Sequence, residues 1–391
     1  MHAHKSEICA NGQVKRQQNF TCVPPPANVS RAVAKRLRHL RIYNAASNAL
    51  VSDVEVWKDR AILATLFGGW YASNIAFNLY NKQVLSAFPH PLTMTTLQFG
   101  IGSVLAVSMW VSGVVKRPDI SFQAVQGLLP LAIVHTLGNV LTNISLGAVS
   151  VSFTHTIKAM EPFFSVLLSA IFLGDIPSLP VLLTLFPIVG GVALASMSEA
   201  SFNWLGFATA MGSNLTFQSR NVLSKKMMLK KEGMDNITMF SIMTVASFFL
   251  LLPFSLLMDG WKFTPAYLAS AGLLEPNTII QQACLAGLCF HTYQQVSYMI
   301  LQRVTPVTHS IGNSVKRVIV IAAAVVFFST PMSTQNAAGT ALALGGVFAY
   351  SQVKRWQRKK KEAQMKVMST ESGSNKNNQN VVILDATVYC D

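Results

Sequence analysis

The chain has 391 residues, of which 51% are hydrophobic and only 12% are charged, whereas an average soluble domain is roughly 25% charged. This composition argues against a soluble enzyme. The 31 Lys and Arg residues outnumber the 16 Asp and Glu residues, but the bases gather in two tails and in short loops, so nucleic acid is not an expected partner. The five cysteines are scattered without metal-type spacing and predict neither a disulfide framework nor a zinc site.

Residues 1–57 form a basic leader segment. Residues 1–52 include eight Lys and Arg residues and one acid, and no apolar run among them is long enough for a secretory signal peptide. A basic, acid-poor composition is typical of an organellar transit peptide. A disordered basic tail fits the composition nearly as well, so both interpretations stay open.

Residues 58–353 contain ten nearly charge-free apolar blocks, each long enough to cross a hydrocarbon core of about 30 Å. We therefore predict an all-α membrane protein with ten transmembrane helices. Because ten is even, both termini lie on one side, and the Lys and Arg residues of the short loops predict that this side is the topological inside. The predicted spans are 60–81, 91–113, 124–147, 150–173, 178–197, 204–224, 236–257, 277–301, 306–329 and 335–352.

The two halves of this region, about 58–200 and 201–353, resemble each other. Thr154-His155 recurs as Thr308-His309, and the stretch 189–196 aligns with 344–351. Because each half has five spans, the second half enters the membrane from the opposite side. This arrangement predicts an inverted repeat, which secondary transporters use to alternate access to a site at the membrane midplane.

Residues 354–391 follow the last predicted span. The segment opens with a basic run at 354–361 and continues into a stretch rich in Ser and Asn. This composition predicts a disordered, solvated tail at a membrane surface.

Ionisable residues inside the apolar blocks are the candidates for a binding site, because a charge at membrane depth is costly unless it faces a cavity or a partner. Lys158 lies in the fourth span, and Lys316 and Arg317 lie at similar depth in the equivalent ninth span. Three bases against one acid, Glu161, leave an excess of about two positive charges that a bound anion would neutralise. Arg offers a planar fork and Lys a compact charge, so phosphate is the natural ligand.

Alternatives to this interpretation stay open. Lys158 and Glu161 are three residues apart and could form an ion pair within one helix. Arg220 lies close to a basic loop, where it could anchor the topology instead of binding a ligand. Pro162 removes an amide that would bond the carbonyl of Lys158, which predicts a kink beside the site. For His135 and His291 we favour a hydrogen bond between helices over ligand binding.

Four stretches of the chain closely resemble the plastidic phosphate translocators, a family of antiporters in the drug/metabolite transporter superfamily. The resemblance covers about residues 58–353 and implies exchange of a phosphorylated compound for inorganic phosphate across the inner plastid envelope, without a cofactor and with both termini in the stroma. The stretches are VSFTHTIKAMEPFF (151–164), QSRNVLSKK (218–226), YQQVSYM (293–299) and GNSVKRV (312–318).

The resemblance also implies roles for individual residues. Those that hold the phosphate are Lys158, Lys316 and Arg317. Those that contact the organic part of the substrate are Thr142, Arg220 and Tyr293.

Within the family, the sequence looks most like the phosphoenolpyruvate/phosphate branch, on the basis of residues 135–139, 158–162 and 218–221. Triose-phosphate members tend to carry a histidine where this chain has Asn139, which we therefore place at the substrate. The expected function is exchange of phosphoenolpyruvate for inorganic phosphate. A triose-phosphate or other sugar-phosphate exchanger is the alternative, and a nucleotide-sugar carrier is more remote. An enzyme is not indicated, because the sequence carries no acid–base dyad, metal cluster or nucleotide-binding loop.

Overall fold

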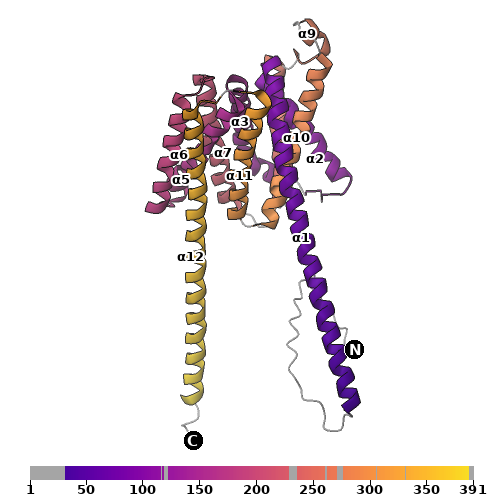
Figure 1. The fold of residues 1–391 in the computed structure, drawn as a ribbon, viewed down its shortest axis with the longest axis vertical. Helices are drawn as coiled ribbons and strands as arrows, with labels where there is room; N and C mark the ends of the chain where they lie inside the picture. Colours follow the sequence, from indigo (N-terminus) through magenta and orange to yellow (C-terminus); the bar gives the residue numbers. More distant parts are fainter. Residues whose placement is uncertain are drawn as a thin grey trace. The chain divides into compact units, whose positions relative to one another are not determined.

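The computed structural model describes residues 31–115, 117–118, 122–228, 236–259, 262–270, 276–304, 306–330 and 332–386. All regular structure within these ranges is helical, which confirms the predicted all-α class (Figure 1). The elements are α1 (Arg31–Ala87), α2 (Pro91–Val111), α3 (Phe122–Ala148), α4 (Val151–Ile157), the 3₁₀ turn η1 (Lys158–Met160), α5 (Glu161–Leu173), α6 (Leu179–Met197), α7 (Trp204–Met228), α8 (Asn236–Met258), α9 (Pro265–Ser270), α10 (Pro276–Arg303), α11 (Pro306–Phe328) and α12 (Thr334–Ala386).

The chain divides into two compact units, Met1–Ala61 and Ile62–Asp391. In the first unit, residues 31–61 belong to α1, which overlaps the segment 1–57 that the sequence predicts to be a transit peptide or a disordered basic leader. The run from 31 to 42 is rich in Ala, Leu, Arg and Lys, which are good helix formers. Residues 1–30 of the predicted leader lie outside the described residues, and its targeting role stays a prediction.

The second unit contains six stretches that are helical, long and apolar enough to cross a membrane, counted over the described residues alone. These stretches are Pro91–Val111, Gln126–Ala148, Val151–Leu173, Leu179–Met197, Ile237–Met258 and Thr308–Phe328. Each coincides with a predicted span. The other four predicted spans fall within α1, α7, α10 and α12, which carry more polar or small residues. The protein is therefore an all-helical membrane protein, and the ten-helix inverted repeat stays a prediction.

The fourth predicted span is interrupted at its centre. Helix α4 ends at Ile157, η1 makes one tight turn, and α5 begins at Glu161. Pro162 has no amide hydrogen to donate to the carbonyl of Lys158, and the amide of Glu161 bonds this carbonyl instead. The sequence predicts a kink or a broken helix here, and the structure shows the break, which includes two of the ionisable residues of the span, Lys158 and Glu161.

Helices α6 and α12 pack closely because two glycines face each other. A Cβ atom on Gly191 would lie 2.6 Å from the carbonyl oxygen of Gly339, and one on Gly339 would lie 2.8 Å from that of Gly191. Any side chain at either position would push the two backbones apart. Small residues at such contacts are typical of helix packing in membranes.

Beyond the predicted last span, α12 continues as a helix to Ala386 and runs past the ends of the other helices of its unit (Figure 1). The sequence predicts a tail without regular structure there. Residues 354–367 are rich in Lys, Arg and Gln, which favour a helix, and Arg358 Nε lies 2.8 Å from Glu362 Oε1 one turn away. Residues 387–391 lie outside the described residues.

Candidate functional site

A cavity of about 560 Å³ lies in the second unit, a size that suits a small ligand. Eight helices and the η1 turn line it, from both halves of the chain. All seven predicted site residues line this cavity: Asn139, Thr142, Lys158, Arg220, Tyr293, Lys316 and Arg317. The structure therefore brings together residues that are up to 178 positions apart in the sequence, while their roles in binding stay predictions.

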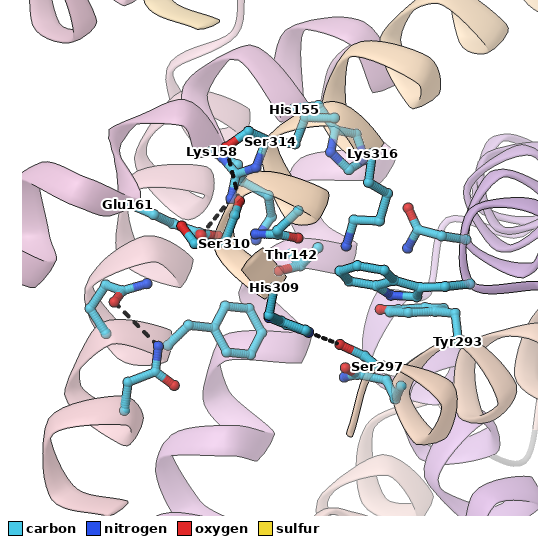
Figure 2. A pocket seen from close by; sticks show the side chains of 18 of the residues that line it. Thr142, His155, Lys158, Glu161, Tyr293, Ser297, His309, Ser310, Ser314 and Lys316 are labelled. Atoms are coloured by element: carbon cyan, nitrogen blue, oxygen red, sulfur yellow. Dashed lines mark hydrogen bonds and ion pairs between the residues drawn. The ribbon is translucent and has the colours of Figure 1, made fainter. Parts of the chain in front are cut away.

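Two lysines face each other from opposite sides of the cavity. Figure 2 shows Lys158 beside Glu161 on one side, and Lys316 beside Tyr293 on the other. The Lys158 ammonium donates to Ser213 Oγ at 3.1 Å and lies 4.8 Å from the centre of the Phe217 ring. Neither lysine forms an ion pair with a described carboxylate, so both ammonium groups keep donors for a ligand.

Lys316 lies against aromatic rings. Its ammonium is 4.7 Å from the centre of the Trp70 ring and 5.7 Å from that of Tyr293. Aromatic faces attract a cation without accepting all three of its N–H donors. The ring of Tyr293 is in turn fixed by Phe77 and Phe290, at centroid distances of 5.4 and 5.6 Å. This arrangement stabilises a buried positive charge and leaves it able to bind an anion.

Arg317 forms an ion pair with Glu161, which joins α11 to the start of α5. This contact replaces the alternative in which Glu161 pairs with Lys158 on its own helix. The Arg317 side chain is buried, and its Nη1 atom has no hydrogen-bond partner among the described residues. A buried guanidinium donor without a partner is costly in a protein interior. A phosphate oxygen in the cavity would satisfy it.

Arg220 on α7 also lines the cavity and is held by three contacts. Its Nη1 atom lies 2.9 Å from His135 Nδ1, its Nη2 donates to Asn221 Oδ1 at 3.3 Å, and its guanidinium lies 5.2 Å from the centre of the Phe217 ring. The side chain thus points into the cavity, which favours a binding role over topological anchoring. The predicted hydrogen bond between helices at His135 is confirmed. The one predicted at His291 is wrong, because neither ring nitrogen of His291 has a hydrogen-bond partner among the described residues.

Asn139 and Thr142 complete the predicted set on α3. Asn139 Nδ2 donates to the backbone carbonyl of His135 at 2.8 Å, and Thr142 Oγ1 donates to that of Gly138 at 2.8 Å. Each residue therefore bonds back to its own helix, and its remaining polar atoms are available to the cavity.

Two histidines of the cavity were not predicted as site residues. His155 Nε2 lies 2.9 Å from Asn78 Oδ1, and His309 Nε2 lies 2.9 Å from Ser297 Oγ (Figure 2). The His309 ring also stacks on Trp70, with centroids 4.9 Å apart. The repeated Thr-His pair was the signal for them, because a polar pair that recurs at equivalent positions of two repeats marks a shared location.

One boundary of the cavity is a buried network of amide side chains from α1, α2 and α3. Asn143 donates to Thr95 Oγ1 and Gln98 Oε1 at 2.8 and 3.0 Å, while Asn81 donates to Asn143 Oδ1 at 2.9 Å. Beyond the network, the Lys82 ammonium donates to the carbonyls of Leu146 and Val149. These bonds tie α1 to the end of α3 beside the cavity.

An all-helical membrane unit around a cationic cavity has the architecture of a membrane transporter. Residues 61–351 match the model of the Triose-phosphate Transporter family. Since this match spans most of the chain, the protein belongs to that family, and the resemblance predicted from four sequence stretches is confirmed.

Three relatives are similar to this chain over 302 residues, which are 77% of its length. The chain is 63% identical to phosphoenolpyruvate/phosphate translocator 1, chloroplastic, of Oryza sativa subsp. japonica, and covers 74% of that protein. It is 61% identical to the protein of the same name from Arabidopsis thaliana, with 74% coverage. It is 60% identical to the triose phosphate/phosphate translocator, non-green plastid, chloroplastic, of Brassica oleracea var. botrytis, with 75% coverage.

Proposed function

We propose that the protein is an antiporter that exchanges phosphoenolpyruvate for inorganic phosphate across the inner envelope membrane of a plastid. The observation that carries this proposal is the cavity itself, in which four bases surround one carboxylate. The names of two relatives, both phosphoenolpyruvate/phosphate translocators of chloroplasts, support the substrate and the organelle.

The charge of the cavity suits this substrate. Lys158, Arg220, Lys316 and Arg317 against Glu161 leave an excess of three positive charges. Phosphoenolpyruvate carries one carboxylate and a phosphate of about −1.5 to −2 near neutral pH, so it nearly neutralises this excess. Inorganic phosphate neutralises about two of the three. Both anions therefore stabilise the cavity, and neither needs a metal or ATP to bind.

We assign Lys158, Lys316 and Arg317 to the phosphate group and Arg220 to the carboxylate. Phosphate is bound well by a fork of guanidinium donors together with point charges, and Arg317 has a donor without a partner. Arg220 lines the same cavity and lies over the Phe217 ring, as Lys158 does, and Asn139, Thr142 and Tyr293 also line the cavity. A short anion with charged groups at two positions would contact the lysines and Arg220 together.

Ten spans in two inverted halves fit this role. Among the four predicted spans outside the six apolar stretches, those on α1, α7 and α10 are less apolar because their polar residues line the cavity. Examples are Asn74 and Asn78 on α1, and Gln218 and Arg220 on α7. The span on α12 is less apolar because it carries small residues, such as Gly339, that pack against α6. By the positive-inside rule, both termini then face the stroma.

Obligatory exchange follows from the same charges. Closing an empty cavity would remove its bases from water with nothing to neutralise them, which is costly. A loaded cavity avoids this cost. Only the loaded carrier would then change the side to which it opens, and each anion that leaves must be replaced by another.

The triose-phosphate alternative is retained because a relative of nearly equal identity is named a triose phosphate/phosphate translocator. Triose phosphates carry a phosphate at one end of the chain and a hydroxyl and a carbonyl group elsewhere, but no carboxylate. They would leave Arg220 without an anionic partner. The fixed guanidinium of Arg220 therefore favours phosphoenolpyruvate.

Competition experiments on purified protein in liposomes separate the two functions. Labelled phosphate is exchanged against internal phosphate while phosphoenolpyruvate, 3-phosphoglycerate or dihydroxyacetone phosphate is added outside. We expect phosphoenolpyruvate to compete best. If dihydroxyacetone phosphate competes equally well or better, the substrate assignment is wrong and the triose-phosphate alternative holds. If labelled phosphate does not exchange at all, the proposed function is wrong as a whole.

A further inference from the structure

His135 is a fully buried histidine on α3 that contacts Arg220 on α7. The two side chains are 85 positions apart in the sequence, and Arg220 Nη1 lies 2.9 Å from His135 Nδ1. His135 does not line the cavity, whereas Arg220 does. The histidine therefore lies behind the arginine, on the side away from a ligand.

The chemistry of this contact fixes the protonation of the imidazole. A guanidinium has only N–H donors, so His135 Nδ1 must accept the hydrogen bond. The ring is then neutral and carries its proton on Nε2. This Nε2 atom is buried and has no hydrogen-bond partner among the described residues.

The surroundings of His135 are otherwise aromatic. The rings of Phe99 and Phe240 lie with centroids 5.5 and 6.3 Å from that of His135. A buried polar donor without a partner destabilises a protein, and an apolar side chain would suit such a setting better. Arg220 Nη1 lies 2.9 Å from His135 Nδ1, and Asn139 Nδ2, on the same helix as His135, lies 3.4 Å from it. The contact with Arg220 is thus the shorter of the two.

We propose that His135 is a positioning residue for Arg220, and that it thereby determines the selectivity of the cavity for an anion with a carboxylate. It holds the Nη1 edge of the guanidinium, while Asn221 holds Nη2 and Phe217 lies under the plane. The remaining edge is directed to the substrate. This role rests on the proposed exchange of phosphoenolpyruvate for phosphate.

The test compares His135→Leu with the matched control His291→Leu. His291 is also a buried histidine and stacks on the same Phe240, at 5.5 Å, but neither of its ring nitrogens has a hydrogen-bond partner among the described residues and it does not line the cavity. A general effect of losing a histidine from this core would appear in both variants.

The readout is the half-saturation concentration of phosphoenolpyruvate against that of phosphate, both measured in labelled exchange. We expect His135→Leu to raise the value for phosphoenolpyruvate about ten-fold, as for loss of a hydrogen bond to a charged group, and that for phosphate by about two-fold or less. His291→Leu should leave the ratio of the two values unchanged. An equal change for both anions in folded His135→Leu protein means a merely structural role and overturns the proposal.

Amide variants keep the test decisive if His135→Leu does not fold. The amide oxygen of His135→Asn reaches the place of Nδ1, whereas that of His135→Gln reaches toward Nε2. We expect the Asn variant to retain more preference for phosphoenolpyruvate than the Gln variant. The reverse order, or no difference between the two, contradicts the proposal.

A double variant separates positioning from direct binding. In an Arg220→Ala background, His135→Leu should have no further effect on phosphoenolpyruvate, because there is no guanidinium left to orient. An additive loss overturns the proposal. If the wild-type protein exchanges phosphate but not phosphoenolpyruvate, the proposed function fails separately, and the His135 series is then measured with 3-phosphoglycerate, which also has a carboxylate.

Discussion

Two bases of the cavity, Lys316 and Arg220, are held in different ways. Lys316 rests on the faces of Trp70 and Tyr293, which leave its donors available. Arg220 instead has its guanidinium bonded to His135 and Asn221, so its direction is fixed. The comparison teaches that attraction of an anion and discrimination between anions reside in different residues. An ammonium group whose donors are not fixed by hydrogen bonds, such as that of Lys316, binds any phosphate. A guanidinium held in one direction, such as that of Arg220, recognises a second anionic group at a set position.

The largest effect is expected at Lys316, whose donors are not fixed. Lys316→Ala should weaken phosphate and phosphoenolpyruvate alike by roughly ten- to a hundred-fold, because it removes a charge-assisted contact to a buried anion. Lys360→Ala is the control, since Lys360 also lies over a tryptophan ring, that of Trp356, but outside the cavity. Exchange at the wild-type rate by folded Lys316→Ala protein would break the comparison.

A smaller and selective effect is expected at the fixed base. Arg220→Lys retains the charge but loses the planar fork that meets a carboxylate with two parallel bonds. We expect the half-saturation concentration of phosphoenolpyruvate to rise several-fold more than that of phosphate. Competition curves with both anions measure this ratio. Equal losses would show that Arg220 supplies only charge, as the lysines do.

Asn139→His should change selectivity more modestly. Asn139 lies on α3 one turn from His135 and lines the cavity next to the fixed guanidinium. An imidazole there adds a donor suited to a hydroxyl or carbonyl group. We expect the preference for phosphoenolpyruvate over dihydroxyacetone phosphate to narrow by a few-fold, measured by competition for labelled phosphate. An unchanged or wider preference excludes Asn139 from discrimination.

The smallest effect is expected for charges exposed to water. Asp259, just after α8, accepts bonds from Lys262 at 2.7 Å and His90 at 3.0 Å, and the bond from Lys262 lowers the pKa of its carboxyl below the ordinary value. A carboxyl whose pKa is lowered on folding stabilises the folded state at any pH above its ordinary pKa. This stabilisation is lost as the pH falls through the lowered pKa.

Thermal unfolding of Asp259→Asn in detergent measures this contribution. The variant should melt slightly below the wild-type protein at pH 7, because exposed ion pairs contribute little. The difference should shrink as the pH falls below the ordinary carboxyl pKa of about 4, and it should be lost once the pH has passed the lowered pKa of Asp259. A difference that stays constant over this range would mean that the carboxylate charge is not its cause.

The sequence was sufficient to find the bases, because a charge within an apolar block is rare and costly. It also located the kink at η1, since the missing amide of Pro162 is a purely local property. The partner of Glu161 was not predictable, because Lys158 on the same helix and Arg317 on a distant one are both compatible with the sequence. The packing of α11 against α4, which precedes Glu161 in the chain, decides between them.

The contacts that hold Arg220 and Lys316 depend on packing in the same way. His135 and Arg220 are 85 positions apart, and nothing in the spacing along either helix aims one at the other. Trp70 lies in a helix far from Lys316 in the sequence, so its place beside the cavity follows only from the tertiary fold. Local patterns therefore identified which residues carry charge, while the packing determined how each charge is held.

The most direct test of the central claim is uptake of labelled phosphate into liposomes that contain the wild-type protein and either phosphoenolpyruvate or no anion inside. If the four bases that line the cavity require an anion before the cavity can close, uptake should be rapid into loaded liposomes and at background into empty ones. Equally rapid uptake into empty liposomes would contradict the account, because the carrier would then change the side to which it opens without a bound anion.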